Sequence, residues 1–149
     1  MNIWGKKSKR VIETLHPTWK QILEVVLQRI DISAVEGRRT PEYQFGLYKK
    51  GRELIDGVWE VVGKTVTDKD GYEKLSVHQT DPSKAVDVLT AGSGYADIKA
   101  AIYLGSLIVN VAWMMGHEVR WGGDWDRDQD MTDQNFMDYW HFELVLKDS

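Results

Sequence analysis

The chain has 149 residues, of which 42% are hydrophobic and 28% are charged. A chain of this length and composition is expected to fold as one domain, residues 1–149, with an apolar core of its own. Lysine and arginine total 19 and aspartate and glutamate 23, so the net charge is −4, which argues against nucleic-acid binding. The sequence contains no cysteine, which excludes disulfides, thiolate nucleophiles and thiolate metal ligands.

No segment has the features of a secretion signal or a membrane span. The basic cluster within residues 6–10 is followed by interrupting polar residues, and we interpret it as a solvated end. The most apolar stretch, residues 100–115, is shorter than the roughly twenty residues that cross a bilayer and contains Ser106 and Asn110. We therefore expect cytoplasmic synthesis and no stable membrane association.

Helical periodicity predicts three helices. Residues 17–30 carry an apolar stripe and begin with a proline, which the first turn of a helix tolerates. Thr40 followed by Pro41 is typical of a helix start and predicts a helix that ends near Gly51. Residues 95–115 form the longest apolar pattern and predict a central helix.

The remaining segments predict β-structure. Residues 34–39 are short and extended, and residues 58–75 are β-rich around Asp70-Gly71, which predicts a hairpin or a long ordered loop. Further strands are predicted at residues 85–89, 118–121 and 140–146. Segregated helices and antiparallel strands indicate an α+β fold, with helices packed on a small, mostly antiparallel sheet.

Two histidines and one aspartate fall at these predicted strands. His78 precedes the strand at 85–89, Asp87 lies within it, and His141 opens the last strand. Two imidazoles and one carboxylate, with a fourth position left to water, are a common ligand set of catalytic zinc. Spacing alone leaves the assignment open, because single histidines and strand-end aspartates are usually exposed or hydrogen-bonded residues without a ligand.

The sequence around these residues resembles the zinc D-alanyl-D-alanine carboxypeptidase family. Residues 76–80 (Ser-Val-His-Gln-Thr) and 85–87 (Ala-Val-Asp) are similar to the family motif S-x-H-Q-T-G-x-A-x-D. Residues 138–141 (Asp-Tyr-Trp-His) resemble its second motif, an acidic residue three positions before a histidine. Residues 37–40 (Gly-Arg-Arg-Thr) resemble its G-x-R-[ST] element.

One departure from the family motif lies between the first two candidate ligands. His78 and Asp87 are two residues further apart than in the family, because residues 81–84 stand where the family has glycine and one further residue. Asp81-Pro82-Ser83 favours a turn that would absorb the insertion. Asp81 remains an alternative to Asp87 as the carboxylate ligand.

The resemblance implies the fold of the DD-peptidase and Hedgehog group and a single zinc ion. The implied zinc ligands are His78, Asp87 and His141. Asp138 is the implied general base, and Arg39 is implied to donate to the carbonyl oxygen of the substrate. Ser76 and Gln44 are implied to bind the substrate or to support the site.

Several assignments stay open beside these. Glu143 shares a strand face with His141, so it is either an alternative base or a partner that orients this histidine. Residues 124–133 carry alternating aspartates, so a second cation there is an alternative to a solvated acidic loop. Trp121, Trp125 and Trp140 are the tryptophans placed to line a cleft.

The resembled family cleaves peptide bonds next to D-amino acids in bacterial cell-wall peptides. Its short members without a signal peptide look like phage endolysins, which act on the wall after release from the host cell. We therefore expect a monomeric L-alanyl-D-glutamate endopeptidase acting on peptidoglycan, without a separate wall-binding domain. The alternatives are a D-alanyl-D-alanine carboxypeptidase, a cross-link endopeptidase, a non-catalytic zinc domain of the same fold, or a plain structural phage protein.

Overall fold

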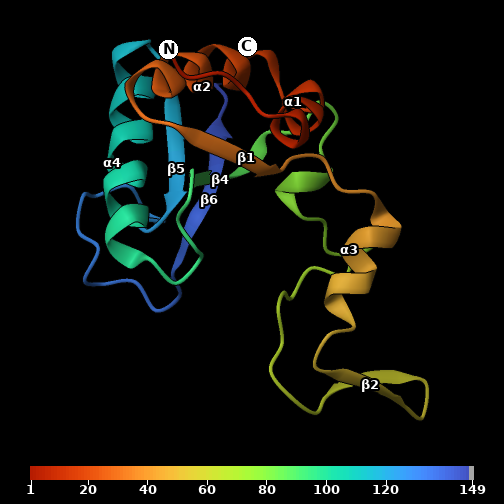
Figure 1. Ribbon diagram of the computed structural model, residues 1–149. Coiled ribbons are helices and arrows are strands. Elements are labelled where there is room, and N and C mark those ends of the chain that lie inside the picture. Colours follow the sequence, from red (N-terminus) through yellow and green to blue (C-terminus); the bar gives the residue numbers. More distant parts are fainter. Residues whose placement is uncertain (148–149) are drawn as a thin grey trace.

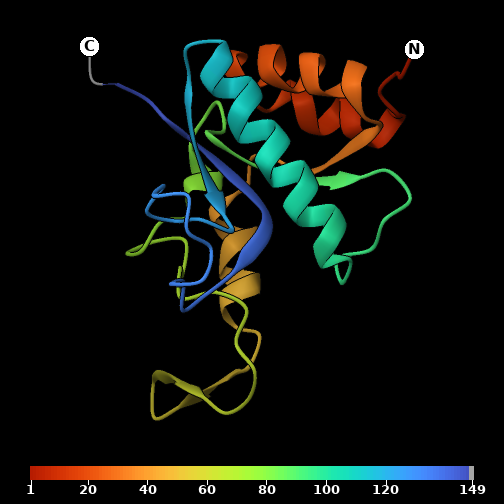
Figure 2. The ribbon, with the colours of Figure 1, turned by 90° about the vertical axis from the view of Figure 1, so that its left-hand side faces the viewer.

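A four-stranded antiparallel sheet forms the centre of the computed structural model, which describes residues 1–147 (Figure 1). The strand order is β1 (Ile32–Glu36), β4 (Ala85–Thr90), β6 (Asp138–Val145) and β5 (Glu118–Gly122). A separate antiparallel hairpin, β2 (Arg52–Ile55) and β3 (Val58–Val61), projects away from this sheet (Figures 1 and 2).

Two helices cover one face of the sheet. They are α2 (Pro17–Arg29) and α4 (Ile98–Met114), which pack against each other and over the strands (Figure 2). The shorter elements are α1 (Lys6–Glu13), which packs on β1, α3 (Pro41–Tyr48), which leads to the hairpin, and the 3₁₀ helix η1 (Val77–Gln79). No helix within residues 1–147 is long and apolar enough to cross a bilayer. The α+β fold expected from the sequence is confirmed.

The alternation of side chains along β4 and β6 separates the core from the polar face. Five of their even-numbered residues are buried in the core: Val86, Val88, Trp140, Phe142 and Leu144. Successive strand residues point to opposite faces of a sheet. Asp87, His141 and Glu143 therefore project from the face that α2 and α4 leave uncovered. The register pairs Asp87 directly with His141, so the two side chains are neighbours across the strands.

The basic N-terminal cluster has exposed cations, as its interpretation as a solvated end predicts, and it is carried on a helix. Residues 6–13 form α1, because Val11 and Ile12 pack against the core and Ser8 is buried. The Ser8 hydroxyl accepts a hydrogen bond of 3.2 Å from the amide of Ala34 in β1. The cluster's cations lie on the exposed side of an amphipathic helix.

Of the two alternatives for residues 58–75, the structure has the ordered loop after β3, and the hairpin lies earlier in the chain. Its turn is Asp56-Gly57, where both residues have positive φ (50° and 78°), as a tight two-residue hairpin turn requires. Asp70-Gly71 lies within this loop. Asp70 Oδ1 accepts hydrogen bonds from the amides of the three residues 72–74, and this local pattern competes with strand pairing.

The close approach of α4 to β5 generates a stability prediction. A Cβ at Gly105 would lie 2.1 Å from the indole of Trp121, so Gly105→Ala must push helix and strand apart. We expect a loss of about 1–3 kcal/mol in the free energy of unfolding, measured by thermal or urea denaturation. Gly46→Ala is the control, because Gly46 lies in α3 with open space around its Cβ position. This control should be neutral or stabilising by up to about 1 kcal/mol; equal stability of Gly105→Ala and wild type would contradict the packing.

Candidate metal centre

His78, Asp87 and His141 converge on the uncovered face of the sheet. Each offers one ligand atom, and the three atoms lie within 4.8 Å of one another. His78 Nε2 lies 3.2 Å from His141 Nδ1 and 3.3 Å from Asp87 Oδ1, and His141 Nδ1 lies 3.1 Å from the same carboxylate oxygen. The two histidines are buried, with exposed fractions of 1% and 8%. The three side chains therefore form one compact cluster.

Hydrogen bonds on the outer side of each imidazole fix which nitrogen faces the cluster. His78 Nδ1 lies 2.7 Å from the carbonyl oxygen of Gly37, and His141 Nε2 lies 2.9 Å from Glu143 Oε1. A carbonyl and an ionised carboxylate can only accept, so these two ring nitrogens carry the hydrogens. When a metal ion replaces the proton shared with Asp87, the inner nitrogens are the ones that present lone pairs to it. This is the arrangement that metal-binding histidines adopt.

Charge at the cluster follows from this geometry. Burial alone raises the pKa of Asp87, but hydrogen bonds from His141 and His78 outweigh burial and hold this pKa below its usual range. Burial alone lowers the pKa of His141, but Asp87 and Glu143 raise it to about 9. Both shifts have the same meaning: the cluster attracts positive charge, as a set of metal ligands must.

The insertion between His78 and Asp87 forms a loop that is fixed to the N-terminal region. The amide of Ser83 donates to the carbonyl of Thr14 at 2.9 Å, and Ser83 Oγ donates to the carbonyl of Ala85 at 2.7 Å. Asp81 lies at the surface, where it pairs with Arg38 at 3.5 Å, and its side chain is 68% exposed. The structure thus brings Asp87, and not Asp81, to the two histidines.

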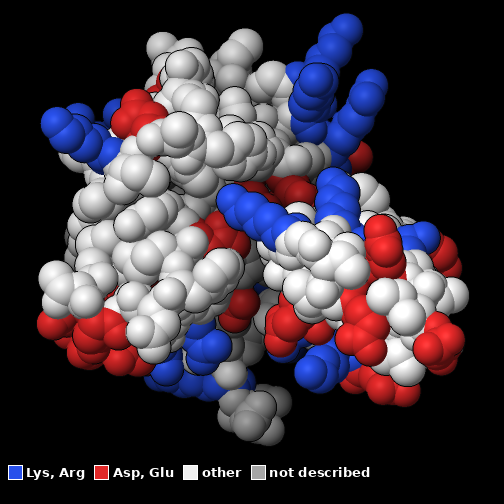
Figure 3. All heavy atoms as spheres, turned by 90° about the horizontal axis from the view of Figure 1, so that it is seen from below, with Lys and Arg blue, Asp and Glu red and all other residues white. Residues whose placement is uncertain are grey.

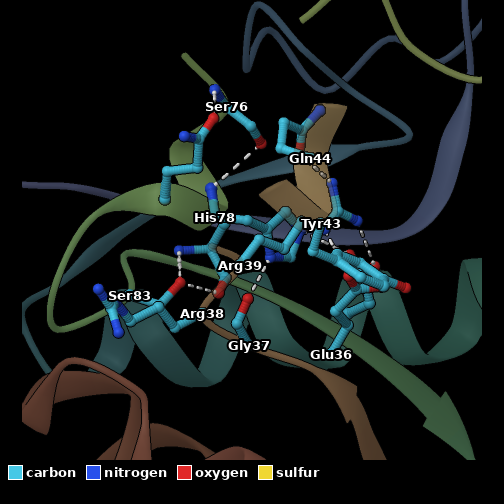
Figure 4. A network of polar contacts seen from close by, with 12 residues as sticks. Glu36, Gly37, Arg38, Arg39, Tyr43, Gln44, Ser76, His78 and Ser83 are labelled. Atoms are coloured by element: carbon cyan, nitrogen blue, oxygen red, sulfur yellow. Dashed lines mark hydrogen bonds and ion pairs between the residues drawn. The ribbon is translucent and has the colours of Figure 1, made fainter. Parts of the chain in front are cut away.

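Gly37 allows the chain to pass close to the N-terminal region just before Arg39. A Cβ at Gly37 would lie 2.4 Å from Thr14 Oγ1, so a side chain does not fit there. The carbonyl of the same residue is the acceptor for His78, and the amide of Arg39 donates to the carbonyl of His78 at 2.7 Å. This segment and η1 therefore hold each other in place beside the cluster (Figure 4).

Arg39 is held beside Asp87 by three partners. Its Nε donates to Glu36, Nη1 donates to Gln44 Oε1 at 3.1 Å, and Nη2 lies 3.7 Å from Asp87 Oδ2. The Gln44 side chain is fully buried, and its Nε2 donates to the carbonyl of Lys69 at 3.0 Å. Gln44 therefore holds Arg39 (Figure 4) and the loop that contains Lys69 in place.

Ser76 is the N-terminal cap of η1. Its hydroxyl accepts a hydrogen bond of 3.3 Å from the amide of His78, and its own amide donates to Gln79 Oε1 at 3.0 Å. This reciprocal pair is a capping box. The motif residues 76–79 thus close one helical turn that presents His78, and Ser76 also lines the cleft beside the cluster.

Asp138 and Glu143, the two candidates for a general base, differ in their surroundings. Glu143 contacts His141 and lies 3.8 Å from Arg120, and the hydrogen bond to His141 leaves the pKa of Glu143 lowered although burial acts to raise it. Asp138 lines the cleft, and burial raises the pKa of its carboxyl above the usual value. Glu143 is thus occupied in orienting His141, whereas Asp138 has no hydrogen-bonded side-chain partner within residues 1–147.

Comparison with known proteins identifies the family. The family described as phage L-alanyl-D-glutamate peptidase matches residues 2–145. The chain belongs to this family. The sequence-based expectation of a peptidoglycan-cleaving peptidase of the phage endolysin type is confirmed by this membership. No curated protein matches the chain significantly.

The chain shares its fold with a solved bacterial enzyme. The chain is similar to the crystal structure of Serratia marcescens L-Ala D-Glu endopeptidase ChiX, with a TM-score of 0.64 and 21% sequence identity. The match covers 97% of this chain and 91% of that chain. At this identity the similarity establishes the fold.

A cleft of about 580 Å³ opens beside the cluster of this peptidase. One wall comes from α3, the start of β2 and the loop at residues 65–69, and the opposite wall includes Trp125 and Phe136. Seen from below, the molecule is hollowed between two lobes, with acidic side chains inside the hollow (Figure 3). Of the three tryptophans expected at a cleft, Trp125 lines it, while Trp121 and Trp140 are buried in the core.

The acidic loop at residues 124–133 is held by its own hydrogen bonds. Asp124 accepts from the amides of Asp128 at 3.2 Å and Gln129 at 3.0 Å. Asp124, Asp126 and Asp128 lie near one another, as exposed acidic groups often do. The structure gives no support for the second cation considered from the sequence.

The buried Gln44 generates a prediction about the support of Arg39. Gln44→Leu keeps the volume but leaves a donor of Arg39 and the carbonyl of Lys69 without their partner. We expect a loss of roughly 1–3 kcal/mol in the free energy of unfolding, measured in urea. Tyr43→Leu is the control, because this neighbouring side chain is exposed. If both variants unfold at the same urea concentration, the supporting role of Gln44 is wrong.

Proposed function

We propose that this peptidase uses one zinc ion, held by His78, Asp87 and His141, to hydrolyse the L-alanyl-D-glutamate bond of peptidoglycan stem peptides. The observation that carries the proposal is the convergence of two imidazole nitrogens and one carboxylate oxygen within 4.8 Å, in a chain of this family. We further propose that the enzyme acts as a monomer on the host cell wall during phage lysis, with residues 1–149 as its single catalytic domain.

The donor set fits zinc better than the hard cations. Calcium and magnesium prefer oxygen ligands, whereas two imidazoles and one carboxylate with an open position are typical of catalytic zinc. The outer hydrogen bonds to Gly37 and Glu143 select the ring nitrogens that face the cluster. When bound, zinc would supply Lewis acidity, which polarises the scissile carbonyl and lets water lose a proton near neutral pH and so become a nucleophile.

Asp138 serves in this proposal as the general base. It lies at the start of β6, three residues before His141, and lines the cleft. Burial raises the pKa of this carboxyl toward neutral pH. A carboxylate with such a pKa is better suited to take a proton from the attacking water and to return it to the leaving amine. Gly122 permits this position, because a Cβ there would lie 2.0 Å from the backbone oxygen of Asp138.

Arg39 serves as the donor to the carbonyl oxygen that becomes negatively charged in the transition state. It lines the cleft, offers the planar set of donors of a guanidinium and is held by Glu36, Gln44 and Asp87. A donor fixed in advance stabilises developing charge without reorganising during the reaction. The polar network around Arg39 therefore contributes to the rate through positioning. Ser76, at the rim of the same cleft, is placed to contact the substrate backbone.

The role of Asp138 is tested by Asp138→Asn, which keeps the shape of the side chain and removes its basicity. We expect stoichiometric zinc by metal analysis, and a fall of about 10²- to 10⁴-fold in the cleavage rate of stem peptides. Asp81→Asn is the matched control, because Asp81 is an exposed aspartate of the same motif region. It should retain both zinc and activity. Mass spectrometry of the released fragments identifies the bond, and a full lytic rate in Asp138→Asn excludes this residue as the base.

A measurement of zinc affinity distinguishes Glu143, which orients a metal ligand, from Asp138, the proposed base. Glu143→Ala removes the acceptor for His141 Nε2, so we expect zinc binding to weaken by roughly 10- to 100-fold in competition with a chelator. Glu143→Gln keeps an acceptor oxygen and should weaken zinc binding less. Should Glu143→Gln bind zinc normally yet lose its catalytic rate as Asp138→Asn does, Glu143 would share the base function.

A further inference from the structure

Arg52 lines the cleft at the hairpin end of the wall formed by α3 and β2. One terminal nitrogen of its guanidinium, Nη1, donates to the carbonyl of Tyr48 at 2.6 Å and to that of Thr67 at 2.9 Å. The guanidinium carbon lies 3.9 Å from the centre of the Tyr48 ring, which is close enough for cation–π attraction. The side chain is therefore fixed between the end of α3 and the loop at residues 65–69.

The charge of Arg52 is not balanced by a carboxylate. The other two cations that line the cleft have acidic partners: Arg39 contacts Glu36, and Lys69 lies 3.7 Å from Asp68. Within residues 1–147, no carboxylate oxygen lies within 4.0 Å of the Arg52 guanidinium. Among the same residues, only its Nη1 makes hydrogen bonds, and Nε and Nη2 make none. Backbone carbonyls hold this group without neutralising it, so it retains donors and a full positive charge at the cleft.

Helix α3 sets the spacing between Arg52 and the catalytic region. Gln44 contacts Arg39, and Tyr48, four residues later, contacts Arg52. Residues i and i+4 lie on one side of a helix and are separated by about 6 Å along its axis. An extended peptide advances about 3.3–3.6 Å per residue. The contacts that hold Arg39 and Arg52 are thus about one helical turn apart along α3, a length that one or two residues of an extended peptide span.

We infer that Arg52 is a specificity-determining residue that binds the free carboxylate of the D-glutamyl residue on the amine side of the cleaved bond. The inference rests on the proposed function. Glutamate has two carboxyl groups, and the peptide chain continues through only one of them, so the other stays free in the substrate. A guanidinium with unused donors is suited to such a carboxylate, because it forms charge-assisted hydrogen bonds of defined geometry.

The test compares two synthetic stem peptides that differ in one group: the free carboxylate of the D-glutamyl residue, or the carboxamide in its place. Wild type should cleave the carboxylate peptide with a kcat/KM roughly 10- to 100-fold above that of the carboxamide peptide, as expected for a lost charge-assisted hydrogen bond. Arg52→Gln should lose activity on the carboxylate peptide only, which brings the two values within about threefold. Arg52→Lys retains the charge and should preserve part of the preference.

The comparison of the two peptides separates recognition from a structural role. If Arg52 only holds the loop, Arg52→Gln slows both peptides equally, and that result overturns the inference; so does a wild type without preference. Zinc content and melting temperature of the variants are measured alongside, because the ratio of kcat/KM values is interpreted on folded, zinc-loaded protein. Failure of the proposed function looks different: wild type then cleaves neither peptide at this bond, and the inference falls with it.

Discussion

The site depends on keeping three electron-pair donors close together in a buried place. Asp87 and His141 are paired across β4 and β6, and His78 reaches them from a short helical turn outside the sheet. Such a cluster is electrostatically unfavourable unless a cation joins it. The carbonyl of Gly37 and the carboxylate of Glu143 hold the rings in place from behind. Much of the surrounding architecture, from the glycine at 37 to the capped turn at 76–79, serves this one constraint.

The sequence predicted the parts of the fold that depend on long apolar patterns. The α2 and α4 helices and the three strands that follow residue 84 lie within a few residues of their expected ranges, because their burial repeats with the period of the element. Three spaced motifs were enough to predict which histidines and which aspartate would meet. The match succeeded despite the insertion at residues 81–84, because the extra residues leave the strand and attach to the N-terminal region.

Other features could not be predicted because they depend on contacts between distant segments. α1 carries mostly basic residues in its first turns, and only its packing on β1 distinguishes it from a solvated tail. The sequence left hairpin and ordered loop open around Asp70-Gly71, since Asp56-Gly57 has the same local turn preference and the local sequence does not rank the two. The burial of Gln44 between Arg39 and Lys69 depends on a loop more than twenty residues away. Polar residues of this kind look like surface residues in a sequence.

The cleft has consequences for how such enzymes diversify. Its floor is built from the sheet, whose residues also form the core, whereas both of its walls come from segments that leave the sheet: α3 with the projecting hairpin on one side and residues 123–137 on the other. A change at the hairpin end of the first wall therefore leaves the metal cluster and the core untouched, whereas a change in α3 reaches Arg39 through Gln44. The hairpin is thus the part of this wall that relatives can vary freely, while the turn of α3 that carries Gln44 is tied to the chemistry of the site.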